Sequence, residues 1–446
     1  MSAITHHFAA IVSIGDELTL GQTLDTNSKW LSQRLMELGI VPVEHVTVPD
    51  DCEAHRDALL RLADKVDLIL CSGGLGPTAD DLTREALAKA MGDSLVEDPL
   101  ALAQIEAWYA SRGRTMSDLN RTQALRPTRA KTIPNHHGTA PGLHATMIAR
   151  ASGGGQTSRG CDVFCLPGPP KEMSPMFEQY VVPRLVTPAG KTVRTRVLHT
   201  FGLAESDLAQ RLGAMMSREA LAANKVLVGT TASGGVVSIR MRYEGPLAPV
   251  EAESELDETE RQCRDVAGAY IFGRGGDSLA SVVLAMLKQA GQTIGTVESC
   301  TGGLLGAQMT EVPGSSAAFA GGLVTYTNQL KSSLANVPEA NFEVNGPGAV
   351  SRETATAMAL GGLETLGCDH TLAITGIAGP EGGSAKKPVG LVWIARASKG
   401  DGEVDCRAFQ FSGDRSSIRE WAARTALAMA WQHLAGLPAM KLLREV

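Results

Sequence analysis

The feature that most constrains the fold is a series of short apolar segments that end in small or acidic residues and alternate with segments of helical periodicity. Residues 8–14 form an apolar run that ends in Gly-Asp-Glu, and residues 66–71 form another that ends in a glycine-rich loop. Runs of this length are typical of strands buried on both faces, whereas residues 26–38 and 54–63 repeat apolar positions at helical spacing. The first part of the chain is therefore predicted to be a doubly wound α/β domain, whose ligands bind beyond the carboxyl ends of the strands.

The length of the chain and two changes in composition indicate three domains. A single hydrophobic core stops growing at roughly 250 to 300 residues, and this chain has 446. The glycine-rich segment 152–156 is predicted to be an exposed loop, and residues 273–276 to be a linker. We therefore expect a doubly wound domain in residues 1–185, a small α+β connecting module in residues 186–272 and a C-terminal α/β domain in residues 276–446.

The overall composition and charge argue against several classes of protein. Hydrophobic residues make up 43% of the chain and charged residues 20%, which is a globular balance. A formal net charge of −7 argues against nucleic acid as the main partner, because binding to a phosphate backbone is driven by clustered Lys and Arg. The amino terminus has no signal-peptide pattern, and no apolar stretch approaches the ~20 residues of a membrane span. We expect a cytoplasmic protein that does not bind membranes, with its irregularly spaced cysteines reduced.

The sharpest chemical signal lies in the third domain, between a predicted strand at residues 293–298 and a predicted helix at residues 304–310. The turn that joins them consists of Ser299, Cys300, Thr301, Gly302 and Gly303. A hydroxyl at such a turn can act as a nucleophile, and the glycines let backbone N–H groups approach an oxyanion. The turn equally fits a serine N-cap followed by a glycine-rich turn, and the local sequence alone favours this plainer interpretation.

Further short motifs follow this turn in order and decide between the two interpretations. They are residues 313–316 (Pro-Gly-Ser-Ser), 324–328 (Val-Thr-Tyr-Thr-Asn), 348–351 (Gly-Ala-Val-Ser), 375–380 (Thr-Gly-Ile-Ala-Gly-Pro), 387–390 (Lys-Pro-Val-Gly) and 413–415 (Gly-Asp-Arg). With this pattern, residues 276–436 resemble the CinA family, whose C-terminal domain is a nicotinamide-mononucleotide deamidase. The resemblance implies an amidohydrolase without a cofactor, which recycles pyridine nucleotides by releasing ammonia from nicotinamide mononucleotide.

The resemblance also implies roles for single residues. Ser299 resembles the nucleophile, Lys331 the base that activates its hydroxyl, and Tyr326 the hydroxyl that supports proton transfer. Lys331 then needs a lowered pKa, which burial can supply, whereas a solvated lysine stays charged. Gly302 and Gly303 are expected to hold the oxyanion. Hydroxyl, guanidinium and glycine-flanked amide groups suit the rest of the substrate, and the expected binding residues are Thr301, Ser315, Ser316, Thr325, Thr375, Gly376, Ala378, Gly379 and Arg415.

The first domain matches the same family and resembles the molybdopterin-binding fold over residues 8–180. The matching segments are residues 15–17, 25–28, 73–83 and 166–173. In the family this domain is associated with a metal-dependent ADP-ribose pyrophosphatase. Glycines let backbone amides approach a diphosphate, and carboxylates can hold a hard cation. The expected diphosphate-binding residues are Asn27, Gly73, Gly74, Gly76, Thr78, Lys171 and Glu172, and the expected ligands of a divalent metal ion are Asp16, Glu17, Asp80 and Asp81.

Other interpretations of the first domain stay open. Asp80 and Asp81 precede a predicted helix, where acidic side chains are favoured without any metal. The cofactor-synthesis enzymes resemble Gly-Gly-Thr-Gly followed by Arg-Asp, where this chain has Leu75 and two aspartates. This departure makes the binding of molybdopterin or an adenylylated pterin the second hypothesis, and a noncatalytic competence or DNA-damage factor is the third. We also expect a homo-oligomer, most simply a dimer.

Overall fold

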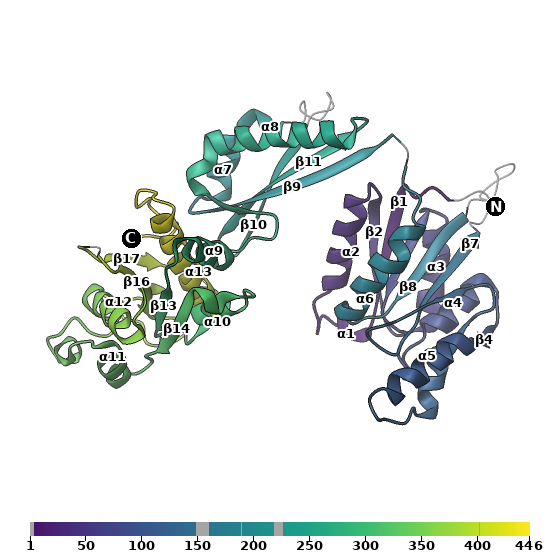
Figure 1. Cartoon of the computed structure of the whole chain (residues 1–446), viewed down its shortest axis with the longest axis horizontal. Helices are drawn as coiled ribbons and strands as arrows, with labels where there is room; N and C mark the ends of the chain where they lie inside the picture. Colours follow the sequence, from purple (N-terminus) through teal and green to yellow (C-terminus); the bar gives the residue numbers. More distant parts are fainter. Residues whose placement is uncertain (1–3, 149–159, 189, 218–225, 401) are drawn as a thin grey trace. The chain divides into compact units, whose positions relative to one another are not determined.

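The structure, a computed structural model, describes residues 4–148, 160–188, 190–217, 226–400 and 402–446, so that the loop predicted at 152–156 lies outside the described residues. The chain divides into two compact units (Figure 1). The first unit comprises Met1–Val193 and Glu244–Pro249, and the second comprises Arg194–Tyr243 and Val250–Val446. Most of the middle module therefore shares a unit with the C-terminal domain.

The first unit is built on a six-stranded sheet with strand order β2-β1-β3-β8-β7-β6. The four strands β2, β1, β3 and β8 are parallel, and β7 and β6 are antiparallel. The elements in chain order are β1 (Phe8–Ile14), α1 (Asp16–Thr19), α2 (Thr26–Glu37), β2 (Val41–Val48), α3 (Cys52–Ala63), β3 (Leu68–Ser72), α4 (Thr83–Met91), β4 (Leu95–Glu97), α5 (Pro99–Ala110), η1 (Asp118–Ala124), β5 (Leu125–Pro127), β6 (Lys131–Ile133), β7 (Gly142–Ile148), β8 (Gly160–Leu166), α6 (Pro170–Met176), η2 (Phe177–Val181) and η3 (Val182–Arg184).

Alternate residues of the central strand β1 face two different cores, because successive side chains of a strand point to opposite faces. Ala9 and Ile11 pack with residues of α2 and α6, whereas Ala10 and Val12 pack with residues of α3 and α4. Helices therefore cover both faces of the sheet (Figure 1), which confirms the predicted doubly wound fold. The strand order reverses between β1 and β3, and such a switch point is where open α/β sheets bind ligands.

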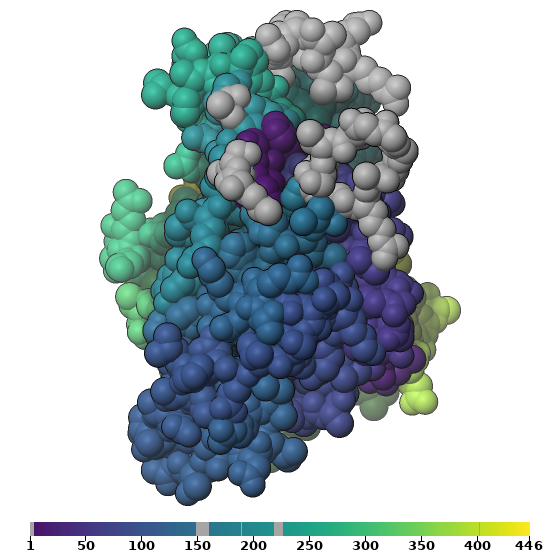
Figure 2. All heavy atoms as spheres, turned by 90° about the vertical axis from the view of Figure 1, so that its right-hand side faces the viewer, coloured from purple at the N-terminus to yellow at the C-terminus, as the bar shows by residue number. Residues whose placement is uncertain are grey.

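A separate lobe extends from this sheet. Its helices α5 and η1 pack around a small apolar cluster of their own, formed by Ala101, Ile105 and Ala124. The lobe occupies the lower end of the face drawn in Figure 2, in blue.

The middle module is a four-stranded sheet with strand order β10-β11-β9-β12. Its elements are β9 (Thr192–Phe201), α7 (Glu205–Leu212), η4 (Gly213–Met216), β10 (Leu227–Ser233), β11 (Val236–Gly245), α8 (Pro249–Ala267), η6 (Gly268–Tyr270) and β12 (Ile271–Arg274). The hairpin of β10 and β11 turns at Gly234 and Gly235, both with positive φ, within the predicted turn.

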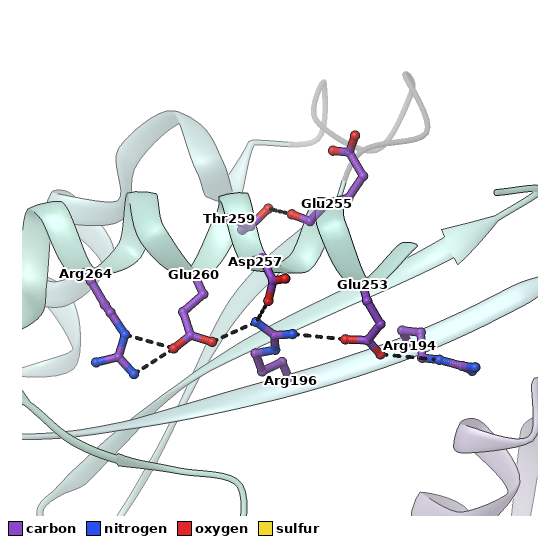
Figure 3. Close-up of polar contacts among 8 residues, drawn as sticks. All are labelled: Arg194, Arg196, Glu253, Glu255, Asp257, Thr259, Glu260 and Arg264. Carbon is purple, nitrogen blue, oxygen red and sulfur yellow. Dashed lines mark hydrogen bonds and ion pairs between the residues drawn. The ribbon is translucent and has the colours of Figure 1, made fainter. Parts of the chain in front are cut away.

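Arginines of β9 are neutralised by the acidic face of α8 (Figure 3). The guanidinium of Arg196 donates to Glu253, Asp257 and Glu260 over 3.0, 2.6 and 2.9 Å. Glu253 also pairs with Arg194. Because these guanidinium groups are engaged with carboxylates, they are poorly placed to bind the phosphates of a nucleic acid.

The C-terminal domain is a five-stranded sheet with strand order β14-β13-β15-β16-β17, in which β14, β13 and β15 are parallel. Its strand order reverses between β13 and β15, so this domain has a switch point of its own. Its elements are α9 (Leu279–Ala290), β13 (Ile294–Glu298), α10 (Leu304–Thr310), η7 (Ser315–Ala317), β14 (Phe319–Val324), α11 (Asn328–Ala335), η8 (Glu339–Phe342), α12 (Arg352–Leu366), β15 (His370–Gly376), β16 (Leu391–Ser398), β17 (Asp405–Gln410) and α13 (Arg415–Leu434).

Two expectations about the whole chain can be compared with these elements. The eight cysteines are all free thiols, as predicted. Among the described residues, no helix has both the length and the apolar character that crossing a membrane requires.

Candidate active sites

Ser299 lies at the carboxyl end of β13, at the switch point of the C-terminal sheet. Its N–H donates to the carbonyl of Ile374 in β15 over 2.9 Å, which fixes the backbone at this position. The parallel register places Glu298 beside Val324 and Ile374. The next residues of the three strands, Ser299, Thr325 and Thr375, therefore meet at one edge of the sheet.

Lys331 reaches this edge from α11. Its Nζ lies 3.0 Å from Ser299 Oγ and 2.8 Å from the carbonyl oxygen of Thr325, and the residue is only 2% exposed. No carboxylate lies within ion-pair distance of Lys331 among the described residues. Burial lowers the pKa of Lys331 below its usual value, because an ammonium group loses solvation there. The structure thus brings together a hydroxyl and an amine whose pKa is lowered by burial, as a Ser-Lys pair requires.

Cys300 makes no hydrogen bond with this pair in the described structure. Its side chain belongs to the apolar core formed with Leu305 and Met309. Burial raises the pKa of the Cys300 thiol to about 12, so the thiol is protonated at neutral pH. Of the two adjacent candidates, only Ser299 has a base within hydrogen-bond distance.

Tyr326 does not contact the pair. Its side chain is 56% exposed, whereas the preceding Thr325 is fully buried. The Tyr326 hydroxyl accepts a hydrogen bond from Arg415 over 3.0 Å, and no hydrogen bond joins it to Ser299 or Lys331 in the described part of the chain. Alternation along extended backbone explains the difference, because Thr325 points inward and Tyr326 outward. The expected support of proton transfer by Tyr326 is thus not provided by this geometry.

The N–H groups of Gly302 and Gly303 were expected to hold an oxyanion, but both donate to acceptors within the protein. Both have positive φ, but the N–H of Gly302 donates to the carbonyl of Ser299 and that of Gly303 to the carboxylate of Glu298. The same carboxylate accepts the N–H groups of Leu305 and Gly306. Gly302 and Gly303 therefore shape the turn and do not offer free donors to an oxyanion.

Thr301 contributes through its backbone. Its side chain is fully buried, and no hydrogen-bond partner of its hydroxyl lies within the described residues. The Thr301 carbonyl accepts two hydrogen bonds from Arg419, of 3.2 and 2.7 Å. Its N–H, two residues after Ser299, has no acceptor in the described structure. The N–H of Cys300, directly after Ser299, likewise has no acceptor among the described backbone groups. The N–H groups of Cys300 and Thr301 are thus the donors of the turn that remain for an oxyanion.

Ser315 and Ser316 lie at the other edge of the sheet. They precede β14, whose first residue, Phe319, pairs with the first residue of β13, Ile294. Ser299 follows the last residue of β13, so the length of a five-residue strand, on the order of 15 Å, separates it from the two serines. Contrary to the expectation, the structure does not bring these serines to Ser299 within one chain.

The loop that follows β15 lies at the same edge as Ser299. Gly379 has a positive φ, and its carbonyl accepts a hydrogen bond of 2.9 Å from Arg415, the first residue of α13. Thr375 is buried and donates its hydroxyl to Ala349, so its side chain already has an internal partner. Gly376 and Ala378 belong to the same strand end and loop. Arg415 is an exposed cation at this edge, where an anionic substrate can meet it.

The first unit has a cavity of about 490 Å³ at its own switch point. Ends of β1, β3 and β8 form its floor, and the predicted residues that line it are Asn27, Gly73, Gly74, Gly76, Thr78, Glu172, Glu17, Asp80 and Asp81. Six carboxylates line the cavity, those of Glu17, Asp25, Asp50, Asp80, Asp81 and Glu172, and neither Lys nor Arg is among the lining residues. Two residues that were expected at this site, Asp16 and Lys171, do not line the cavity.

The glycines of this cavity permit close packing of the loop. A Cβ on Gly73 would lie 2.5 Å from the carbonyl oxygen of Ile14, and Gly73 and Gly74 both have positive φ. Asn27 donates to Ser72 Oγ and to the carbonyl of Gly168, over 2.8 and 2.7 Å. Asn27 thereby ties together the loops that surround the cavity.

The four predicted metal ligands do not form a cluster. Among the described residues, no group of three or more Asp, Glu, His or Cys side chains is placed to hold a metal ion. Asp81 accepts the N–H groups of Gly76 and Thr78 and so holds the glycine loop, and Asp16 accepts the N–H of Asp50. A hydrogen bond from Thr78 lowers the pKa of Asp80. The site therefore lacks a preformed cage, but its carboxylates fit an ion such as Mg²⁺, which is commonly held by one or two carboxylates together with substrate phosphates.

Comparison with known proteins identifies the family. The model of the CinA C-terminal domain matches residues 276–434, that of a probable molybdopterin binding domain matches residues 10–187, and that of the damage-inducible protein CinA KH domain matches residues 195–273. A putative competence-damage inducible protein of Symbiobacterium thermophilum is 40% identical over 440 residues, which cover 96% of this chain and 99% of the relative. The chain belongs to the CinA family.

Two further proteins are similar to this chain. A CinA-like protein of Synechococcus sp. is 41% identical, over 87% of this chain and 89% of its own length. The crystal structure of the competence/damage inducible protein CihA from Agrobacterium tumefaciens is 42% identical over 34% of this chain and 90% of that chain, with a TM-score of 0.33.

Two residues that hold the turn at Ser299 were missed in the sequence analysis. Glu298 is 1% exposed and binds three N–H groups at the start of α10, and Arg419 binds the Thr301 carbonyl. A signal for Glu298 was present, because a lone carboxylate ends an apolar strand just before a glycine-started helix. Arg419 gave no local signal, because 118 residues separate it from its partner.

Proposed function

We propose that the C-terminal domain deamidates nicotinamide mononucleotide, with Ser299 as nucleophile and Lys331 as base. The observation that carries the proposal is the 3.0 Å contact of a buried lysine, held without a carboxylate partner in the described structure, with a serine hydroxyl at a switch point. A serine hydroxyl is a weak nucleophile until a neighbouring base takes its proton. Lys331 is the residue positioned to do so.

The reaction can be written with these groups. Neutral Lys331 takes the proton of Ser299, and Oγ attacks the carboxamide carbon to form a tetrahedral oxyanion beside the N–H groups of Cys300 and Thr301. The Lys331 ammonium then gives its proton to the leaving nitrogen, which departs as ammonia and leaves an ester on Ser299. Water, deprotonated by Lys331, attacks the ester, and its proton returns to Ser299 Oγ as nicotinate mononucleotide is released.

Arg415 supplies the charge that a mononucleotide needs. Its guanidinium lies at the sheet edge that carries Ser299 and keeps donor groups beyond its bonds to Gly379 and Tyr326. Guanidinium groups bind phosphate oxygens well. We therefore assign the phosphate of the substrate to Arg415, with Tyr326 orienting that arginine.

We further propose that the first domain hydrolyses the diphosphate of ADP-ribose with a divalent metal ion, which would offset phosphate charge and help to activate water. The acidic lining of the cavity supports the need for a metal ion, because a diphosphate among six carboxylates needs a counter-ion. Glu17 and Asp80 are the carboxylates we assign to such an ion. Tight pterin binding at the Gly73 loop without any metal would favour the alternative hypothesis.

The experiment for the deamidase measures ammonia released by the full-length chain. We expect nicotinamide mononucleotide to yield one ammonia and one nicotinate mononucleotide per turnover, and free nicotinamide, which lacks the phosphate for Arg415, to react far more slowly. Absence of ammonia from the mononucleotide would refute the proposal. Chromatography of the same preparation measures the oligomeric state, for which we propose a dimer.

A further inference from the structure

The second unit contains another cavity, of about 390 Å³, between the middle module and the C-terminal domain. Strands of the module form one wall, and the start of α9, the end of α10 and the middle of α13 form the other. Neither Ser299 nor Lys331 nor Arg415 is among its lining residues. Its volume lies within the range of small-molecule sites, and neither proposed activity uses it.

The lining of this cavity combines both signs of charge with hydroxyl groups and an apolar floor. The guanidinium of Arg424 faces it, together with the carboxylates of Asp277 and Glu311. Hydroxyls come from Thr231, Ser233, Ser238 and Ser278, and the apolar floor comes from Val236, Phe272, Leu279 and Leu427. The Ser238 hydroxyl contacts the ring of His199, which also lines the cavity, and the Ser278 hydroxyl caps α9, so Thr231 and Ser233 offer the hydroxyls that a ligand can use. A purely anionic ligand meets two carboxylates here. A purely cationic ligand meets the charge of Arg424, which Glu420 offsets only through a partly exposed contact of 3.4 Å. The lining therefore suits a hydroxylated molecule that carries one anionic and one cationic group.

Two helices connect this cavity to the catalytic turn. Helix α10 starts directly after the turn, with its first N–H groups bound to Glu298, and places Gln308 in the cavity. Helix α13 holds the Thr301 carbonyl through Arg419 and, about 7.5 Å further along its axis, places Arg424 in the cavity. Arg424 also donates to the carbonyl of Gly234 in the hairpin over 2.8 Å. A ligand that contacts Arg424 thus acts on the helix that positions the turn.

We propose that this cavity is an effector site for a small hydroxylated zwitterion, and specifically for a pyridine mononucleotide. Such a molecule has a cationic ring for Asp277 and Glu311, ribose hydroxyls for Thr231 and Ser233, and a phosphate for Arg424. The choice of this class rests on the proposed function, because it makes the effector the substrate of the same chain. Binding at the cavity then changes the deamidation rate through α10 and α13.

The test counts binding events in the full-length chain. The Ser299→Ala background prevents turnover, and nicotinamide mononucleotide is titrated by calorimetry without divalent metal. Ser233→Trp and Thr231→Trp fill the cavity from exposed positions of β10, whereas Ala232→Trp, on the same strand but absent from the lining, is the matched control. We expect both filling variants to lose one binding event per chain and the control to lose none. Equal stoichiometry in all three variants would overturn the proposal.

Two probes test the class of ligand. Ribose 5-phosphate carries only the anionic half of the mononucleotide, and nicotinamide riboside carries only the cationic half. Each should bind the cavity at least about tenfold more weakly than nicotinamide mononucleotide, as expected when a charge-assisted contact is lost. Equal affinity of either half would overturn the assignment of a zwitterion.

The effector role has its own readout in chains that retain Ser299. A plot of the deamidation rate against the concentration of nicotinamide mononucleotide should not be hyperbolic for the parent chain. The plot should become hyperbolic in Ser233→Trp and stay non-hyperbolic in Ala232→Trp. Hyperbolic kinetics in the parent chain would overturn the effector role. Failure of this proposal can be distinguished from failure of the proposed function. If only the proposed function fails, the parent chain releases no ammonia but still shows the binding event that Ser233→Trp abolishes.

Discussion

The substitution Lys331→Arg separates the charge of this side chain from its basicity. Arginine is effectively never deprotonated in proteins, so it can keep an electrostatic contact but cannot accept the proton of Ser299. Lys331 Nζ is the basic group within 3.0 Å of Ser299 Oγ. General-base catalysis contributes about 10²- to 10⁴-fold, so kcat/KM for deamidation should fall at least about 100-fold, equivalent to about 3 kcal/mol or more.

The assay follows ammonia release against pH for the parent chain and the variant, with Lys288→Arg as the matched control at an exposed lysine of α9. Since burial lowers the pKa of Lys331 from 10.5 and the active form is deprotonated, kcat/KM of the parent should rise with pH and level off below that value. A thermal melt checks that the variant is folded. If Lys331→Arg retains most of the activity, Lys331 is only a charge and another group activates Ser299.

Three further predictions concern the metal-dependent site, the two serines before β14, and Tyr326. Chelation of divalent metal, or Asp80→Asn, should abolish ADP-ribose cleavage. Ammonia release should stay within about twofold of the parent rate, because the two sites lie in different units. Equal losses of both activities in a folded variant would contradict separate sites. Ser315→Ala and Ser316→Ala should leave KM for nicotinamide mononucleotide unchanged within about twofold, because these serines lie at the opposite edge of the sheet; a tenfold rise would mean that another copy of the chain brings them to the site. Tyr326→Phe should lower kcat by less than about tenfold, since its hydroxyl contacts Arg415 and not the Ser-Lys pair, and a loss of about 100-fold or more would restore Tyr326 to proton transfer.

The fold was accessible from the sequence because its main signals are local. The apolar run at residues 8–14 and the helix predicted at residues 304–310 have the bounds that the structure shows for β1 (Phe8–Ile14) and α10 (Leu304–Thr310). The end of α2 differed by one residue, since Glu37 is its last residue and Leu38 its C-cap. Such frayed ends are common because the last turn of a helix has unpaired carbonyls.

The site was only partly accessible, because its geometry depends on which edge of the sheet each loop occupies. Motif order linked Ser315 and Ser316 to Ser299, but the crossover through α10 returns the chain to the far edge. The sequence also does not show which acceptor a single backbone N–H will meet. The N–H of Gly303 was expected to hold the oxyanion, but it donates to the carboxylate of Glu298. Long-range contacts, such as that of Arg419 with Thr301, leave no local pattern.

The most direct test of the central claim compares Ser299→Ala with Cys300→Ala in the full-length chain. The two residues are adjacent, but only Ser299 contacts Lys331, whereas Cys300 lies in the core with the pKa of its thiol raised to about 12. With nicotinamide mononucleotide as substrate, Ser299→Ala should release no ammonia above the uncatalysed rate, and Cys300→Ala should keep at least about a third of the parent rate. Ammonia release that survives in Ser299→Ala, or that is lost in a folded Cys300→Ala chain, would contradict the account.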